Sequence, residues 1–211
     1  MKYVSLNHNS SPTSFKKAVI NGLAPDKGLY FPEKKINLTK DFINSIKDLD
    51  DIEICYEVIK EYIGDEIPKN KLIKIINDTV SFRIPLKKIE RSIYSLELFH
   101  GPTLAFKDIG AKFMASCLDY FKDSYTSKKI TVLVATSGDT GGAVANGFSD
   151  TSDIDVCILY PKGKISEVQK KQITTNGSYV NAIEVEGDFD LCQSMVKKAF
   201  NDEEINRKIA L

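Results

Sequence analysis

The apolar run from Ile130 to Ala135 constrains the fold most, because a glycine-rich turn and a helical pattern follow it directly. A continuous apolar run of this length is typical of a strand that is buried on both faces. Helical spacing continues over 143–148, and further strands are predicted over 155–160 and 179–185. Strands that alternate with helices predict a parallel sheet with helices on its faces.

The residues on either side of this region fit the same α/β pattern. Apolar residues alternate with polar ones from Tyr94 to Leu98, which predicts a half-buried strand. A Gly-Pro turn follows, and apolar residues recur at helical spacing over 109–121. Ser166 and Gln169 have the spacing of a capping box, so a helix is expected to begin there. An amphipathic helix is expected over 191–200.

The first part of the chain is predicted to be mostly helical. Helices are expected after Ser14, after Thr39, over 52–63 and from Pro68, with a short strand over 29–31. Pro85 interrupts the helical pattern. We therefore predict two domains, a mostly helical one over residues 1–90 and a parallel-sheet domain over residues 91–211.

Charge and cysteine usage exclude several classes of protein. The chain has 29 basic and 29 acidic side chains, so no nucleic-acid footprint or polybasic membrane anchor is expected. No apolar stretch is long enough to span a bilayer, and we expect a cytoplasmic protein. The four cysteines form no Cys-x-x-Cys pair, so we expect reduced core residues and no metal site: Cys55, Cys117, Cys157 and Cys192.

Lys107 has an unusual position for a lysine. It lies in the first turn of a predicted helix, between Phe106 and Asp108. Most lysines lie on solvated faces, and a surface lysine early in a helix is the alternative interpretation. An amine in apolar surroundings can act as a nucleophile toward a carbonyl carbon, and the natural carbonyl is a cofactor aldehyde.

The turn over residues 136–142 joins the apolar strand to the next helix. Ligands of open α/β sheets bind at the carboxyl ends of strands. Free N–H groups at the helix start, together with the hydroxyls of Thr136, Ser137 and Thr140, favour an anion such as a carboxylate or a phosphate. The turn matches neither a Walker loop nor Gly-x-Gly-x-x-Gly. A tight turn capped by Asp139 is the alternative interpretation.

Together the two segments resemble threonine synthase, a family of fold-type-II pyridoxal-phosphate enzymes. The matching residues are His-Gly-Pro-Thr-Leu-Ala-Phe-Lys-Asp over 100–108 and Thr-Ser-Gly-Asp-Thr-Gly over 136–141. Similarity extends to both ends of the chain, over 22–33, 160–166 and 187–193. The resemblance implies a fold in which a mostly helical N-terminal domain precedes the first part of the parallel-sheet domain.

The resemblance also implies an activity. Threonine synthase converts O-phospho-L-homoserine and water into L-threonine and phosphate, the last step of threonine biosynthesis, with pyridoxal 5'-phosphate as cofactor. The enzyme is a lyase that eliminates phosphate from the γ-carbon. Its substrate is a small molecule, and no oligomeric state or allosteric effector follows from the residues.

The resemblance also implies roles for single residues, assigned by their positions in the matching segments. Lys107 matches the family's Schiff-base lysine, and Asp139 matches a residue near the cofactor's phenolic oxygen. Ser137, Gly138 and Thr140 match the loop that receives the substrate carboxylate. Two loop lysines, Lys162 and Lys164, are candidates for the substrate phosphate, with solvated loop lysines as the alternative. His100 is expected to be a structural residue with a hydrogen-bonded ring.

Length is the main departure from the family. Its members are roughly twice as long, and the glycine- and asparagine-rich loop for the cofactor phosphate is not found over 176–211. We therefore expect a truncated chain with an incomplete sheet. Two alternatives to threonine synthase stay open: a catalytically incompetent fragment that acts as a binding module, and another fold-type-II activity such as serine or threonine dehydratase.

Overall fold

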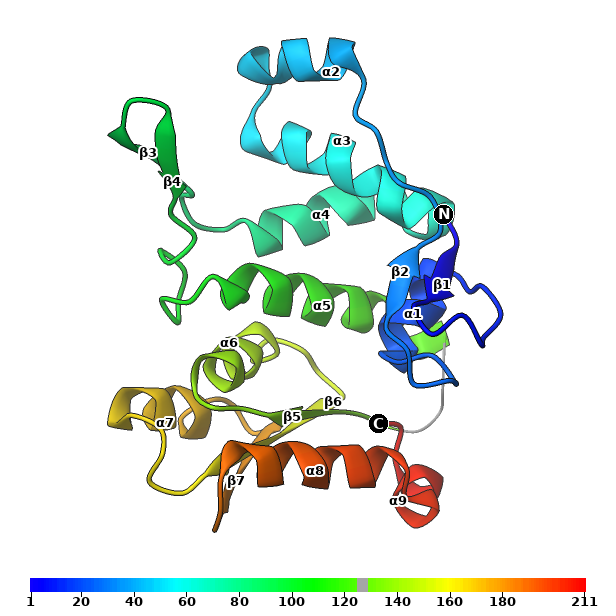
Figure 1. Cartoon of the computed structure of the whole chain (residues 1–211), viewed down its shortest axis with the longest axis vertical. Coiled ribbons are helices and arrows are strands. Elements are labelled where there is room, and N and C mark those ends of the chain that lie inside the picture. The colour runs from blue at the N-terminus through cyan, green and yellow to red at the C-terminus, as the bar shows by residue number, and fades with distance from the viewer. Residues whose placement is uncertain (125–128) are drawn as a thin grey trace. The chain divides into compact units, whose positions relative to one another are not determined.

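Two compact units make up the computed structural model, which describes residues 1–124 and 129–211 (Figure 1). The first unit spans Met1–Val80 and the second spans Ser81–Leu211. The sequence-based boundary after residue 90 falls in the turn of a β-hairpin whose two strands pair with each other. A division there would separate hydrogen-bonded partners, so the units divide ten residues earlier, at Val80.

The first unit is mostly helical, as the apolar spacing predicts. Two short strands pair antiparallel, and four α-helices and two 3-10 turns complete the unit. These elements are β1 (Tyr3–Ser5), α1 (Phe15–Asn21), β2 (Tyr30–Pro32), α2 (Lys40–Ser45), η1 (Ile46–Asp48), α3 (Asp51–Ile63), η2 (Gly64–Glu66) and α4 (Lys69–Thr79). Apolar side chains of α3, α4 and the turn between them form its core: Ile63, Ile67, Leu72, Ile75 and Ile76.

Side-chain caps fix the helix starts of this unit. The Ser14 hydroxyl accepts from the Lys17 N–H at 3.2 Å, and the Thr39 hydroxyl accepts from the Phe42 N–H at 3.1 Å. Both caps confirm the starts predicted from the sequence. The Glu66 carboxylate also accepts from the first two N–H groups of α1, from 50 residues away in the chain. This long-range cap links α1 to η2, the 3-10 turn that follows α3.

The second unit begins with an exposed hairpin. Strands β3 (Leu86–Glu90) and β4 (Ile93–Leu96) pair antiparallel, with an irregular register near the turn. The sequence predicts a half-buried strand here, and that prediction is wrong about burial. Large apolar side chains on both strands are more than half exposed within the described chain: Leu86, Ile89, Ile93, Tyr94 and Leu96. Alternation marks a strand, but it buries a face only where another layer packs against it.

A three-stranded parallel sheet lies at the centre of the second unit, as the alternating pattern predicts. Its order is β5 (Ile130–Ala135), β6 (Ile154–Pro161) and β7 (Val180–Val185). Five α-helices and one 3-10 turn surround these strands: α5 (Lys107–Phe121), η3 (Lys122–Ser124), α6 (Asp139–Gly147), α7 (Glu167–Thr174), α8 (Phe189–Phe200) and α9 (Glu203–Lys208). Figure 1 shows α6 on one face of the sheet and α8 on the other.

Each face of the sheet is packed by a different set of side chains. Val156 and Ile158 of β6 are fully buried, and Gly141 of α6 lies against Ile158. The opposite face forms a cluster of Leu159, Val185 and Cys192, which joins the strands to α8. The sequence predicts that β5 is buried on both faces. Burial on both faces is more complete in β6, because β6 is the strand with a hydrogen-bonded neighbour on each side.

After α9 the chain returns to the free edge of β5. Ala210 forms a parallel bridge with Ile130, and the Thr131 N–H donates to the Ala210 carbonyl at 2.7 Å. Strands β6 and β7 lie on one side of β5, and Ala210 lies on the other. The chain direction across the sheet therefore reverses at β5. In open α/β sheets, ligands bind outside the carboxyl end of the strands at such a switch point.

None of the described helices is long and apolar enough to cross a membrane.

Candidate active site

Lys107 is the first residue of α5, the helix that follows the loop over residues 99–106. The lysine is half-buried, and its Nζ lies 4.5 Å from the centroid of the Phe106 ring. Within residues 1–124 and 129–211, no carboxylate forms an ion pair with this amine. The Lys107 amine therefore lies beside an aromatic face and has no carboxylate partner among the described residues.

A buried carboxylate organises the loop before Lys107. Asp108 is only 4% exposed, and it accepts hydrogen bonds from the Thr103 N–H at 3.0 Å and from the Thr103 hydroxyl. A Cβ on Gly101 would lie 2.5 Å from the Asp108 carboxylate and 2.8 Å from the Phe82 ring. A larger residue at Gly101 would have to displace one of these two side chains. The sequence draws attention to Lys107, but the residue next to it holds the loop in place.

The same loop leaves its apolar side chains in the open. Leu104 and Phe106 are 72% and 61% exposed, and Leu104 has a positive φ of 60°. A left-handed backbone is costly for a branched residue and tends to occur at functional sites. The turn therefore exposes two apolar side chains, and one of them, Phe106, lies beside the Lys107 amine.

Thr136 organises the second loop, which follows β5. It is 1% exposed, and its hydroxyl oxygen accepts from the Gly138 N–H at 2.9 Å and from the Gly141 N–H at 2.8 Å. A Cβ on Gly141 would lie 2.6 Å from the Thr136 methyl group. The sequence suggests Thr136 as an anion ligand, but its hydroxyl serves the loop itself.

Three other backbone donors of this loop are available. In the described part of the chain, the N–H groups of Ser137, Asp139 and Thr140 donate no hydrogen bond. They lie at the start of α6, where the helix dipole favours negative charge. Asp139 does not cap this helix, so the capping interpretation of this residue is wrong. Gly138, with a φ of +139°, is the N-cap residue instead.

Helix α7 connects both loops, a role that the sequence did not indicate. Gln169 donates from Nε2 to Asp139 Oδ1 at 2.8 Å, and Gln172 donates from Nε2 to the Thr103 carbonyl at 3.2 Å. The predicted capping box of Ser166 and Gln169 is confirmed. That motif predicts the helix start, but the contacts with residues 30 and 69 positions away depend on the tertiary fold.

The remaining candidates lie outside this arrangement. His100 Nε2 lies 2.8 Å from Glu97 Oε2, which fits the structural role expected of a hydrogen-bonded ring. Lys162 forms an ion pair with Glu186, so this lysine is not a free loop cation. Lys164 is exposed, and no ion pair to it is found among the described residues. The structure joins the loops of Lys107 and Asp139 through α7, and it joins neither loop lysine to them.

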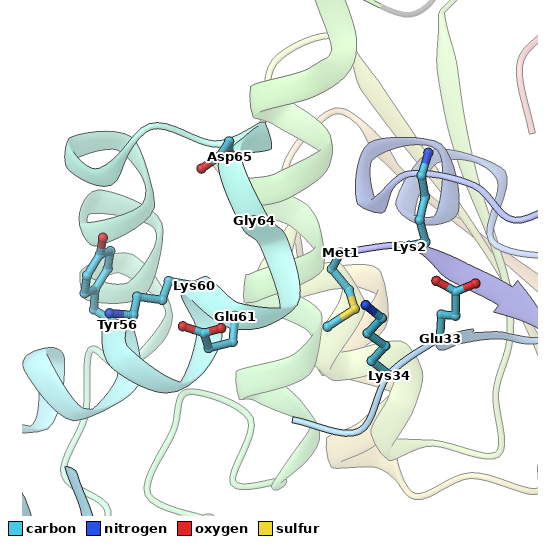
Figure 2. Close-up of a pocket in the computed structure, with 9 residues that line it drawn as sticks. All are labelled: Met1, Lys2, Glu33, Lys34, Tyr56, Lys60, Glu61, Gly64 and Asp65. Carbon is cyan, nitrogen blue, oxygen red and sulfur yellow. The ribbon is translucent and has the colours of Figure 1, made fainter. Parts of the chain in front are cut away.

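The first unit carries a separate open depression of about 550 Å³ (Figure 2). Three lysines and three carboxylates line it, together with Met1, Tyr56 and Gly64; the charged residues are Lys2, Lys34, Lys60, Glu33, Glu61 and Asp65. Small-molecule sites are mostly apolar with a few placed polar groups. This balanced charged surface has a different character, and it contains none of the predicted site residues.

Comparison with protein-family models separates the chain into the same two parts. Residues 2–80 match the model described as the threonine synthase N terminus, and residues 80–208 match the model of pyridoxal-phosphate dependent enzymes. The chain belongs to the pyridoxal-phosphate dependent enzymes. Lys107 and the turn after β5 both lie in the part that matches this family.

Curated relatives and solved structures agree with this assignment. Threonine synthase of Haemophilus influenzae is 43% identical over 211 residues, and that of Escherichia coli strain K12 is 41% identical. Each match covers 100% of this chain and 48% of the relative. A crystal structure of the Escherichia coli enzyme has a TM-score of 0.90 at 40% identity, covering 100% of this chain and 49% of that one.

A pyridoxal-phosphate-bound threonine synthase from Brucella melitensis gives a similar result. Its TM-score is 0.88 at 37% identity, and the match covers 97% of this chain and 45% of that one. The expected fold class, a mostly helical domain followed by part of a fold-type-II domain, is thereby confirmed. The chain spans about half the length of the curated relatives it matches.

The residues of the two loops suit an aldehyde cofactor of this family. Lys107 supplies an amine without a carboxylate partner in the described chain, and such an amine is the group that bonds to an aldehyde. The free N–H groups of Ser137, Asp139 and Thr140 suit an anionic group. The chemistry of this donor set therefore fits the family's cofactor.

Proposed function

We propose that this chain carries the catalytic lysine and the substrate turn of a threonine synthase. The reaction converts O-phospho-L-homoserine and water into L-threonine and phosphate. The observation that carries the proposal is the Lys107 amine, placed at the start of α5 beside an aromatic ring and without a carboxylate partner in the described chain. The curated relatives support the choice of reaction. We further propose that the protein is cytoplasmic.

Lys107 has two tasks in this proposal. Its amine would hold the aldehyde of pyridoxal 5'-phosphate, and once released it would move protons at the substrate's α- and β-carbons. The cofactor would supply an electron sink for the negative charge that develops on those carbons. In the overall reaction, phosphate leaves from the γ-carbon, which gains a proton to become the methyl group of threonine, and the hydroxyl of water replaces a proton at the β-carbon. The Phe106 ring, whose centroid lies 4.5 Å from the Lys107 Nζ, lies next to this amine.

The turn after β5 receives the substrate carboxylate in this proposal. The N–H groups of Ser137 and Thr140 point from the start of α6, and both residues also carry a hydroxyl. Gly138 gives the backbone the positive φ that this turn requires. We assign Asp139 to the cofactor side of the turn. A carboxylate near an anionic substrate needs compensation, and the Gln169 amide supplies a donor to it at 2.8 Å.

Cofactor uptake is the first test of this proposal. The 211-residue chain mixed with pyridoxal 5'-phosphate is expected to turn yellow, and borohydride is expected to bleach the colour and fix the cofactor to the peptide that contains Lys107. Lys107→Ala is expected to lose both the colour and the labelled peptide. Lys112→Ala is a matched control on the same helix, because Lys112 pairs with Asp150 at 2.9 Å. The loop that holds the cofactor phosphate in this family is not found in the chain, so the mixture is also tested with a polypeptide that corresponds to the C-terminal half of the Escherichia coli relative. No colour in either mixture would contradict the proposal.

Turnover separates the alternatives. Phosphate released from O-phospho-L-homoserine identifies a threonine synthase, whereas ammonia released from serine or threonine identifies a dehydratase. The assay is run with the chain alone and with a polypeptide that corresponds to the C-terminal half of the Escherichia coli relative. Cofactor uptake without turnover in either mixture would favour a binding module.

A further inference from the structure

The side of α7 that faces the two loops carries two glutamines, Gln169 and Gln172. Residues three apart on a helix lie on the same face. Gln172 contacts the loop of Lys107 through the Thr103 carbonyl, and Gln169 contacts the turn after β5 through Asp139. A single helix face thus contacts both segments of the candidate site.

A second hydrogen bond fixes the orientation of the Gln169 amide toward Asp139. Its Oε1 accepts from the Ser166 N–H at 2.9 Å, as part of the capping box that begins α7. An amide has one acceptor and one donor end, so this contact leaves Nε2 to point away from the helix. Nε2 then donates to Asp139 Oδ1 at 2.8 Å. A rotation of the amide would lose both hydrogen bonds together.

The backbone of the turn is shaped around this amide. A Cβ on Gly138 would overlap the Gln169 amide group, so only glycine allows the turn to lie this close to α7. The positive φ of Gly138 points to the same requirement. Gln172 has a similar relation to α6, because a Cβ on Gly142 would lie 3.2 Å from its Oε1. The two glutamines of α7 therefore lie close to Gly138 and Gly142, and α7 packs against the start of α6.

We propose that Gln169 is a positioning residue for Asp139 and, through Asp139, for the turn that receives the cofactor and substrate. The neutral amide holds one carboxylate oxygen in place and offsets part of its negative charge, which an anionic substrate would otherwise meet. This inference rests on the proposed function, since it assumes that residues 137–140 face the cofactor and the substrate. Gln172 has the corresponding task for the loop that ends at Lys107.

One substitution isolates this role. Gln169→Glu keeps an acceptor for the Ser166 N–H, because Ser-x-x-Glu is also a capping box. It removes the donor to Asp139 and sets two carboxylates against each other. Asp139→Asn in the same chain restores the hydrogen bond with donor and acceptor exchanged. Gln193→Glu is a matched control for charge, since Gln193 is exposed on α8.

The first measurement uses the chain without cofactor. Gln169→Glu is expected to lower the Tm by about 2–4 °C, the shift typical of losing one exposed hydrogen bond in a chain of this size. The double variant Gln169→Glu, Asp139→Asn is expected to recover most of that loss. Equal and additive shifts in the two single variants, without recovery in the double variant, would overturn the pairing.

The second measurement uses the cofactor. Gln169→Glu is expected to weaken the binding of pyridoxal 5'-phosphate by about tenfold and to change its visible spectrum. Because Asp139 itself lies on the cofactor side of the turn, the double variant is compared with Asp139→Asn alone. These two variants are expected to bind the cofactor equally well, since Gln169 acts through Asp139. Gln193→Glu is expected to change neither the affinity nor the spectrum. Recovery of the Tm with no change in cofactor affinity or spectrum would show a merely structural contact and would overturn the positioning role. No cofactor uptake by the wild-type chain, either alone or with the C-terminal half of the Escherichia coli relative, would instead contradict the proposed function itself.

Discussion

The two loops of the candidate site solve the same problem with different chemistry. Each is a tight turn into a helix whose backbone N–H groups need acceptors. The loop before α5 uses a charged acceptor that follows it, because Asp108 binds back to Thr103. The loop before α6 uses a neutral acceptor that precedes it, because the Thr136 hydroxyl binds forward to Gly138 and Gly141. Both acceptors are buried, although only one of them is charged.

The two loops also differ in what they leave exposed. The first exposes Leu104 and Phe106, with the Phe106 ring beside the Lys107 amine, and the second leaves backbone N–H groups without an acceptor in the described chain. An amine beside an apolar ring suits bond formation with a carbonyl, and a row of free donors suits a carboxylate. In the proposed site, the covalent task and the anion-binding task would therefore belong to two turns that are held separately.

Asp108→Ala removes the charged acceptor of the loop before α5 and should have the largest effect. It leaves the Thr103 N–H and hydroxyl buried without an acceptor, so we expect the free energy of unfolding of the second unit to fall by about 3 kcal/mol. Urea unfolding followed by circular dichroism measures it. Asp119→Ala is the control, because this more exposed carboxylate of α5 pairs with Lys122, and its loss should cost less than about 1 kcal/mol. Equal losses for the two variants would contradict the assigned role.

Thr136→Val removes the neutral acceptor of the loop before α6, because it replaces the hydroxyl with a methyl group of similar size. Two backbone N–H groups lose their acceptor, and we expect a loss of about 2 kcal/mol in the free energy of unfolding. Thr174→Val serves as the control, since the Thr174 hydroxyl lies on an exposed helix surface and bonds only to the Lys170 carbonyl. A Thr136→Val chain as stable as wild type would show that the turn does not depend on the hydroxyl.

Gly101→Ala and Gly141→Ala compare the packing of the two loops. The added methyl group at Gly141 meets the Thr136 methyl group at 2.6 Å and lies near two buried isoleucines of the sheet and α7. The one at Gly101 meets the ends of two side chains, the Asp108 carboxylate and the Phe82 ring, which can rotate away at less cost than the packed methyl groups around Gly141. We expect losses of about 2 and 1 kcal/mol respectively, measured by the same unfolding assay. A larger loss at Gly101 would reverse the comparison.

Gly110→Ala should have the smallest effect and the opposite sign. Gly110 lies inside α5, and a Cβ there meets nothing within 4 Å. Alanine is a better helix former than glycine, so we expect a gain of about 0.5–1 kcal/mol in the free energy of unfolding. Calorimetry would register this gain as a higher Tm. A loss of stability would mean that the start of α5 needs backbone freedom after Lys107.

Local features of this chain could be predicted from the sequence, and distant contacts could not. The caps at Ser14, Thr39 and Ser166 were predicted because each acts on an N–H group three residues away. The role of Asp108 was missed, although its partner Thr103 is only five residues away, because a buried acceptor looks like any acidic residue in a helix start. The Gln169 contact joins residues 30 apart, and no periodicity encodes it.

Burial was the other quantity that the sequence did not determine. The alternation before Gly101 correctly indicates a strand, now seen as β4, but whether its apolar side is covered depends on elements elsewhere in the chain. The partner strand β3 was not predicted, since Pro85 and the lysines of this segment favour a loop. The apolar run of β5 identified its strand because five of its six residues are apolar, so the prediction did not depend on which face of the strand is buried.

The bridge between Ile130 and Ala210 has a consequence for the order in which the second unit folds. Strands β5, β6 and β7 pair with their neighbours in sequence, so these contacts close short loops and can form while the chain is still being synthesised. The contact of Ala210 with Ile130 closes a segment of 80 residues and must come last. The edge of β5 is therefore the last edge to be paired, and its Thr131 amide should exchange hydrogen with solvent sooner than the amides of β6.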